Sequence, residues 1–382
     1  MKRILIMVTV LITLVVLPFP VQAVELTVAG KSATLMDVAT GTVLYESNAH
    51  ERLAPASVTK VMTMLLIMEA VDARKIAMTD LVTASDTAAA KGGSQIYLKA
   101  GETMSVSDML KAIAVSSAND CACAMAEHIA GSEEAFVARM NQRAAELGMK
   151  DTHFVNCTGL DDGENADQHK TSAHDIALMS RELLKNHEGI KQFTTIWMDT
   201  LRNGTFGLSN TNKLIRFYQG ATGLKTGFTS GAGYCLSATA KRDGMELIAV
   251  VMGADTSASR NTACKQLLDY GFANFAVFQP ELTEAEPIAV KLGKEKSVDA
   301  VLGENGGILI DKGQKSTVTM DLSLEGPLTA PVSQGQRVGT LAVKAGEQVL
   351  KEIPLVAAEG VERVSFGDLF GMVLRRTAMA KV

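Results

Sequence analysis

The hydrophobic pattern of the chain changes near residue 280, and this change restricts the fold more than any other feature of the sequence. Before it, stretches with helical spacing alternate with short β-type runs. After it, the chain carries only short β-type runs separated by turns with glycine or proline, at 288–292, 307–310, 316–322, 337–343 and 348–356. We therefore expect a mixed α/β (α+β) domain over residues 24–279 and a small all-β sandwich domain over 280–364. A chain of 382 residues is long enough to bury both cores.

Within the first domain, the pattern predicts an order of elements. Helical spacing is expected from Ser57 onward, over 105–148 and over 261–272, and an Asn-, Asp- and Gly-rich loop over 154–168. The remaining β-type runs are expected at 33–37, 42–45, 234–240 and 246–251. An Asp-Gly pair at 243–244 predicts a tight hairpin between the last two runs.

Composition excludes several classes of protein. A formal net charge of −5 and the lack of a long basic run argue against nucleic-acid binding. The six histidines and five cysteines form neither HExxH nor CxxC, so we expect no metal and no cofactor. The cysteines are odd in number and scattered, which favours buried free thiols over a disulfide framework.

The first residues have the pattern of an export signal. Lys2 and Arg3 precede an apolar run at 4–17, and small residues follow at 21–23. The run is shorter than the about 20 residues that a membrane-spanning helix needs. We therefore expect residues 1–23 to be a cleaved signal peptide and the mature chain to be exported.

Ser57 and Lys60 lie one helical turn apart at the start of the first helical stretch. Apolar residues at helical spacing predict one buried face for this helix, made by Val58, Val61, Met62, Leu65 and Leu66. A lysine three residues after a serine can share its face, and a lysine with a lowered pKa can remove the serine proton. S-x-x-K alone is a weak signal, because an N-capping serine and a solvated lysine would give the same pattern.

Two further short motifs follow in the chain. Ser117 and Asn119 form S-x-N between helical stretches, where a hydroxyl can relay a proton and an amide can hold a substrate backbone. Lys225, Thr226 and Gly227 form K-T-G at the start of a predicted strand. The lysine and threonine suit a carboxylate, and the glycine would let a substrate backbone approach closely. Each motif alone has an ordinary structural explanation, a helix cap or a strand-entry turn.

The three motifs in this order are the signature of penicillin-binding proteins and β-lactamases. The chain resembles the serine-type D-Ala-D-Ala carboxypeptidases, the low-molecular-mass penicillin-binding proteins, over essentially its whole length. Further similar segments lie at 53–57, 92–94, 98–102, 168–175 and 271–272. The resemblance implies a penicillin-binding/β-lactamase-like serine hydrolase fold, with an antiparallel sheet and a helical subdomain. Phe228 departs from the best-known members, which often carry histidine there, and this leaves only its backbone N–H with an expected role.

The resemblance also implies a mechanism and a substrate. Lys60 would activate Ser57 as the nucleophile, Ser117 would relay a proton, and Asn119 would complete the catalytic group. The residues expected to bind substrate are Lys225, Thr226, Gly227, Phe228 through its backbone N–H, which with that of Ser57 would form the oxyanion hole, and Arg260. The expected partners are peptidoglycan stem peptides that end in D-Ala-D-Ala, and β-lactam antibiotics as covalent inhibitors.

The C-terminal segment 365–382 has the pattern of a helix that lies in a membrane interface. Five large apolar residues recur at helical spacing: Phe366, Leu369, Phe370, Val373 and Leu374. Cations follow at Arg375, Arg376 and Lys381. The alternative is an ordinary amphipathic helix docked on the β domain. With the export signal, this pattern predicts a peripheral protein on the outer face of the cytoplasmic membrane.

Three other functions share these features. A D,D-endopeptidase on cross-linked peptidoglycan has the same motifs and cannot be separated from a carboxypeptidase by sequence. A class A-like β-lactamase would need an E-x-x-L-N run, and none lies between Asn119 and Lys225. A catalytically silent penicillin-binding sensor or scaffold would have no need to keep Ser57, Lys60 and Ser117 together with Lys225.

Overall fold

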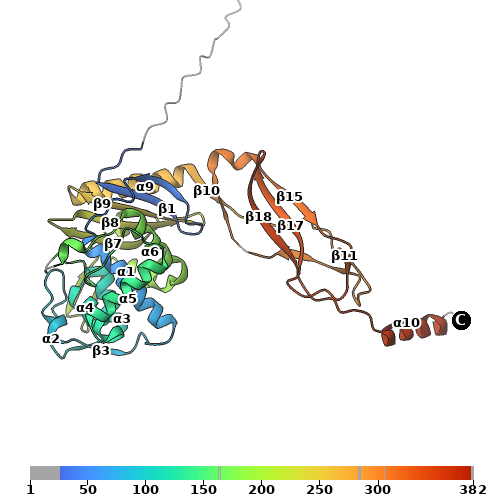
Figure 1. Cartoon of the computed structure of the whole chain (residues 1–382), viewed down its shortest axis with the longest axis horizontal. Helices are drawn as coiled ribbons and strands as arrows, with labels where there is room; N and C mark the ends of the chain where they lie inside the picture. Colours follow the sequence, from blue (N-terminus) through green and yellow to red (C-terminus); the bar gives the residue numbers. More distant parts are fainter. Residues whose placement is uncertain (1–25, 162, 164, 283–284, 305, 380–382) are drawn as a thin grey trace, which may run out of the picture.

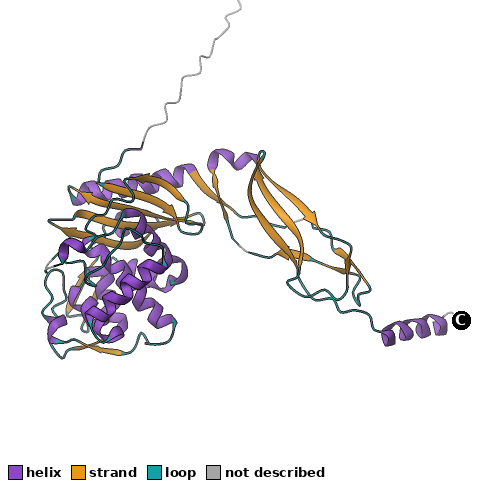
Figure 2. Cartoon of the chain, viewed as in Figure 1, coloured by secondary structure: helices purple, strands orange, loops and turns teal. Residues whose placement is uncertain are grey.

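The computed structural model describes residues 26–161, 163, 165–282, 285–304 and 306–379. The expected signal peptide at 1–23 and the cation Lys381 lie outside these residues. Figure 1 shows a mixed helix-and-sheet part, an elongated β-rich part and a C-terminal helix at the far end of the β-rich part. Figure 2 shows that helices concentrate in the first of these parts. The β-rich character of the second part agrees with the expected all-β fold class.

The first part is built around a five-stranded antiparallel sheet with the strand order β2-β1-β9-β8-β7. Its strands are β1 (Ser32–Asp37), β2 (Val43–Ser47), β7 (Ala221–Thr229), β8 (Gly233–Arg242) and β9 (Met245–Ala254). The expected hairpin joins β8 to β9, and Asp243 and Gly244 both have positive φ, as such a turn requires.

Both faces of this sheet are buried. Leu247 and Val251 of β9 pack in a cluster with α9 (Ser257–Asn274), while Ile248 and Val250 belong to the cluster on the opposite face. This alternation along one strand follows from the period of two in β structure. The sheet therefore lies between α9 and the helical region (Figure 1).

The helical region contains eight α-helices and three 3-10 helices among the described residues. They are η1 (Ala56–Thr59), α1 (Lys60–Asp72), α2 (Asp86–Ala89), α3 (Val106–Ser116), α4 (Asn119–Ala130), α5 (Glu133–Glu146), η2 (Ala166–Gln168), α6 (Ala173–Asn186), η3 (Glu188–Ile190), α7 (Lys191–Thr194) and α8 (Leu214–Phe217). Two hairpins accompany them, β3 (Leu81–Thr83) with β4 (Thr103–Ser105) and β5 (Met198–Leu201) with β6 (Phe206–Ser209). Ser105, Ser132 and Ser172 cap the N-termini of α3, α5 and α6.

Helix α1 differs from the expectation of one buried face. Every residue from Lys60 to Met68 is buried, because α3, α4, α5 and α6 surround the helix. A helix that is apolar around most of its circumference belongs in a core. The helix that follows the Ser57 turn is therefore the central element of this region.

The β-rich part consists of two sheets on one hydrophobic cluster, with a separate two-stranded pair. The larger sheet has the order β13-β18-β17-β15, and the smaller has the order β12-β11-β16. Their strands are β11 (Ile288–Lys291), β12 (Ser297–Val298), β13 (Ala300–Leu302), β15 (Val318–Leu324), β16 (Leu328–Thr329), β17 (Arg337–Ala345) and β18 (Gln348–Ala357), and η4 (Lys312–Thr317) precedes β15. In the pair, β10 (Phe275–Phe278) is antiparallel to β14 (Ile308–Asp311), so β-type pairing reaches back beyond residue 280.

The C-terminal helix α10 (Phe366–Met379) begins where the pattern predicted. The side chain of Ser365 accepts a hydrogen bond from the Asp368 N–H, and the Asp368 carboxylate accepts one from the Ser365 N–H in return. Phe366 is 84 % exposed, and the other four large apolar residues of the stripe are also exposed. Within the described ranges, no helix is both long and apolar enough to cross a membrane.

Candidate active site

Ser57 and Lys60 lie where the 3-10 turn η1 passes into α1. The Lys60 Nζ is 2.9 Å from the Ser57 Oγ and donates a second hydrogen bond, of 2.7 Å, to the Thr158 carbonyl. Burial lowers the pKa of Lys60 to about 7, although the Cys157 thiol and the Asp120 carboxylate oppose this lowering. A lysine that is partly neutral near pH 7 can accept the serine proton.

A second serine–lysine pair lies next to the first. Ser117 ends α3 in the left-handed region, with φ of 64°, and its Oγ accepts a hydrogen bond of 2.9 Å from the Lys225 Nζ. Burial lowers the pKa of Lys225 well below its usual range, and the charges of Lys60 and Arg260 add to this effect. The two motifs that are far apart in sequence are therefore brought into one buried, electrostatically coupled group.

Asn119 begins α4 and holds the segment at 92–94, one of the segments that resemble the family. Its backbone N–H donates to the Ser94 carbonyl over 2.7 Å, and its Nδ2 donates to the Gly92 carbonyl over 2.7 Å. The side-chain atom of Asn119 that faces the Gly92 carbonyl must be Nδ2, because Oδ1 in that place would put two acceptors against each other. The Asn119 Oδ1 is buried and has no hydrogen-bond partner in the described part of the chain, so it is available to a donor from a ligand.

The K-T-G motif lies in the middle of β7 and not at its start. Gly227 faces the protein itself, since a Cβ there would lie 2.6 Å from the Pro55 carbonyl oxygen. The glycine thus lets the Ser57 turn approach the strand, whereas the sequence had suggested an approaching substrate. Thr226 shares a hydrogen bond of 2.7 Å with Thr211, and the exposed ring of Phe228 stacks on Tyr234 at 4.3 Å between centroids.

Arg260 extends from α9 toward the same strand pair. It is 4 % exposed, donates to the Cys235 carbonyl, and its guanidinium carbon lies 5.7 Å from the centre of the Tyr234 ring. Neither Arg260 nor Lys225 forms an ion pair with a carboxylate among the described residues. Because unpaired buried cations are costly, this arrangement suits an anionic ligand.

Two contributors to the site were missed by sequence reasoning. Asp120 is fully buried, and its carboxylate accepts backbone N–H groups of Ile96 and Leu98 at 3.1 and 3.0 Å. It therefore orders the segment that also contacts Asn119. Thr158 contributes only its carbonyl, to Lys60. The sequence offered one signal for Asp120, namely its position directly after the motif residue Asn119.

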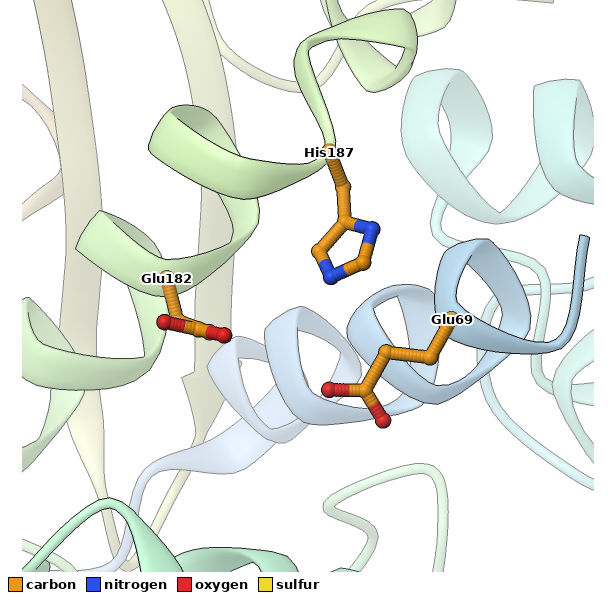
Figure 3. A group of neighbouring side chains, drawn as sticks. All are labelled: Glu69, Glu182 and His187. Carbon is orange, nitrogen blue, oxygen red and sulfur yellow. The ribbon is translucent and has the colours of Figure 1, made fainter. Parts of the chain in front are cut away.

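A group of possible metal ligands lies away from this site. Figure 3 shows Glu69 of α1 and Glu182 of α6 converging beside His187. The Arg143 guanidinium already binds both carboxylates, at 2.7 Å from Glu69 and 2.6 Å from Glu182, and His187 pairs with Asp72. The arginine compensates the charge that a cation would otherwise balance. The group is therefore an ion-pair network that joins α1, α5 and α6.

Comparison with known proteins agrees with this geometry. The profile of the D-alanyl-D-alanine carboxypeptidase family (peptidase S11) matches residues 20–256, and that of the penicillin-binding protein 5 C-terminal domain matches residues 279–363. D-alanyl-D-alanine carboxypeptidase DacF from Bacillus subtilis is 46 % identical over 349 residues, which cover 90 % of this chain and 88 % of the relative.

Two solved structures extend the comparison. Penicillin-binding protein 5 from Haemophilus influenzae has a TM-score of 0.74 at 31 % identity, over 89 % of this chain and 99 % of that one. Penicillin-binding protein D2 from Listeria monocytogenes, in the ampicillin-bound form, has a TM-score of 0.59 at 32 % identity, over 65 % of this chain and 99 % of that one. These matches confirm the penicillin-binding/β-lactamase-like fold with its all-β C-terminal domain. The chain belongs to the peptidase S11 family of D-alanyl-D-alanine carboxypeptidases and is a serine-type hydrolase of that family.

Proposed function

We propose that this enzyme removes the terminal D-alanine of peptidoglycan stem pentapeptides through an acyl-enzyme on Ser57. The observation that carries the proposal is the Lys60 amine, which is buried, lies 2.9 Å from the Ser57 Oγ and has a pKa of about 7. A base with this pKa can take the serine proton and return it later in the same cycle.

In the first step, the Ser57 Oγ forms a bond to the carbonyl carbon between the last two D-alanines while its proton passes to the Lys60 Nζ. The negative charge moves to the carbonyl oxygen. The backbone N–H groups of Ser57 and Phe228 stabilise this oxyanion, and the Asn119 Oδ1 accepts an N–H of the peptide. This role is supported by the burial of that Oδ1, which has no hydrogen-bond partner within the described ranges.

In the second step, the bond between the carbonyl carbon and the leaving nitrogen breaks. The proton held by Lys60 reaches this nitrogen through the Ser117 hydroxyl, and D-alanine departs. Lys225, Thr226 and Arg260 bind its carboxylate. This role is supported by the burial of Lys225 and Arg260, which have no anionic partner among the described residues. Water then attacks the ester, which releases the shortened peptide and regenerates Ser57.

A labelled penicillin tests the nucleophile. The Listeria relative binds ampicillin, and we expect β-lactams to acylate Ser57 here because they present a reactive carbonyl beside a carboxylate. The wild type should become covalently labelled, whereas Ser57→Ala should stay unlabelled while it keeps its fold. Labelling of Ser57→Ala at the wild-type rate would refute the assignment.

Cross-linked peptidoglycan is the alternative substrate of the same site. A D,D-endopeptidase would use the same acyl-enzyme and release a larger amine. Release of D-alanine from a free pentapeptide, measured beside cleavage of a cross-linked dimer, separates the two activities. A β-lactamase would release hydrolysed penicillin rapidly, and a silent sensor would keep the label and release no D-alanine.

The location of the enzyme belongs to the same proposal. We infer export through the segment 1–23 and peripheral attachment to the outer face of the cytoplasmic membrane through α10. The exposure of the five apolar side chains on α10 supports an interfacial helix, since a helix docked on the β-rich part would bury them.

A further inference from the structure

The direction of the Lys60 amine matters for the proposed mechanism. As a base, a neutral amine has two N–H groups and one lone pair, and the lone pair must point at the Ser57 hydroxyl. One N–H is directed at the Thr158 carbonyl over 2.7 Å, and Thr158 belongs to a segment that is remote from α1 in sequence. Because this bond fixes one of the three directions around the nitrogen, the placement of the Thr158 carbonyl affects where the lone pair points.

The side chain of Asn156 holds the peptide units around Thr158. Its Oδ1 accepts the Thr158 N–H at 3.1 Å, the Thr158 hydroxyl at 3.2 Å and the Gly159 N–H at 2.7 Å. Its Nδ2 donates to the Leu160 carbonyl at 2.9 Å. One side chain therefore makes four hydrogen bonds within the turn that presents a carbonyl to Lys60.

This turn is in direct contact with η1, the turn that carries Ser57. Gly159 has φ of +80°, and a Cβ on it would lie 1.8 Å from the carbonyl oxygen of Ala56 and 2.7 Å from the Thr59 Oγ1. Ala56, the residue before Ser57, itself has φ of 48°. The two turns thus pack backbone against backbone, and a displacement of one changes its distance to the other.

We propose that Asn156 is a positioning residue for the reaction, which directs the Lys60 amine at Ser57 by holding the Thr158 carbonyl in place. The proposal rests on the acyl-enzyme mechanism stated above. Asn156 acts through the turn and does not itself touch the reacting atoms.

Several titratable groups surround Lys60 and are common to all variants of the test. They are Asp120 from α4, Lys225 from β7, and Cys157 and His169 from the segment between α5 and α6. None of them is replaced when Asn156 is changed. A shift in the pH dependence of acylation in Asn156→Ala would therefore report on the Thr158 carbonyl, which stabilises the protonated amine, whereas Asn156→Asp adds a carboxylate of its own.

The test is the second-order rate of acylation of the full chain by a fluorescent penicillin, measured as a function of pH. In Asn156→Ala, the rate at high pH should fall by about 10- to 100-fold, as a misdirected catalytic group generally costs. The midpoint of the profile should move down by about one pH unit, because a charge-assisted hydrogen bond to the ammonium is lost. Asn156→Asp keeps an acceptor for the three donors, so it should recover most of the rate and move the midpoint upward.

Asn141→Ala is the matched control. Asn141 bonds both backbone groups of Phe154 in the same loop: its Nδ2 donates to the carbonyl at 2.8 Å, and its Oδ1 accepts the N–H at 2.8 Å. Among the described residues, its side chain makes no hydrogen bond to the turn at 156–160. It should lower the melting temperature without moving the pH profile. If Asn156→Ala has the profile of Asn141→Ala, or if Asn156→Asp is as slow as Asn156→Ala, the inference is wrong.

Two further outcomes separate this inference from the proposed function. A wild type that is not labelled at Ser57 would refute the mechanism and the inference with it, whereas normal labelling with an unmoved Asn156→Ala profile refutes the inference alone. If Asn156→Ala does not fold, Asn156→Asp carries the test through its rate at high pH, which must stay close to that of the wild type because the acceptor for the three donors is kept.

Discussion

His169 is buried between the loop that precedes it and η1, the turn that carries Ser57. It is 3 % exposed, its Nδ1 accepts the Val155 N–H at 3.1 Å, and its Nε2 lies 2.8 Å from the Thr59 Oγ1. The Thr59 hydroxyl donates to the Ala56 carbonyl at 2.9 Å. Since the hydroxyl has one proton, the Nε2–H must donate to it, and the neutral ring with its proton on Nε2 satisfies every contact.

Protonation of His169 would break this arrangement, because the Nδ1 would become a donor facing another donor. Burial lowers the pKa of His169 from 6.5 to about 4, and the charges of His153, Lys170 and Lys60 add to the lowering. At about 1.4 kcal/mol per pH unit, this difference corresponds to about 3 kcal/mol of stability. In the unfolded chain the ring is protonated below pH 6.5, so the contribution is complete above that pH and is lost as the pH falls toward 4.

Urea unfolding of the wild type and of His169→Gln measures this contribution. Trp197 is the one tryptophan of the chain and lies between α7 and β5, so its fluorescence follows the unfolding of the catalytic part. We expect the wild type to lose about 3 kcal/mol more than His169→Gln between neutral pH and about pH 4. Groups that titrate in both proteins cancel in this comparison. Parallel losses in the two proteins would show that His169 is not the acid-sensitive group.

Two further predictions concern the site and the tail. Lys225→Ala should slow acylation by a peptide that ends in a free carboxylate by about 10- to 100-fold, the value of one charge-assisted hydrogen bond. The rate of acylation by the matching peptide amide should change little. Equal losses on both substrates would mean that Lys225 acts on the serines and not on the carboxylate. Truncation before Phe366 should abolish sedimentation with anionic vesicles and leave D-alanine release from soluble peptide unchanged, because the exposed stripe of α10 supplies the apolar contact. Continued sedimentation, or unfolding of the truncated protein, would show instead that α10 is a structural part of the β-rich domain.

The order of elements was largely predictable from hydrophobic spacing, but burial was not. For the helix that begins at Lys60, the apolar residues at i, i+3 and i+4 indicated one face, while Met64 and Ile67 on other sides are equally buried. The spacing of apolar residues along one helix does not tell how many other helices pack around it. In the same way, the pattern placed a strand near Lys225 but not the strand's beginning at Ala221, since Ala221 pairs with Ala240 near the far end of the next strand, β8.

The side chains of the site were predictable where the chemistry requires a particular residue type. The proposed roles of nucleophile, base and carboxylate ligand restrict the residue types at Ser57, Lys60 and Lys225, and the structure brings these three residues together. The Thr158 carbonyl could not be found in this way, because every residue has a carbonyl and only the turn directs it. The environment of Gly227 was wrongly interpreted for a related reason: the approaching Pro55 carbonyl belongs to a distant segment of the chain.

The five free cysteines provide a means to observe partial opening of the enzyme. All are fully buried, and they are distributed over four places: α4 with Cys121 and Cys123, the turn with Cys157, β8 with Cys235 and α9 with Cys264. The β-rich part contains none. A thiol reagent in native buffer would therefore modify each position only when its own segment transiently opens, and mass spectrometry of the labelled peptides would rank these local openings. The same experiment would not detect motions of the C-terminal domain, because that domain has no cysteine. Local opening of the catalytic domain can therefore be followed separately in the intact chain.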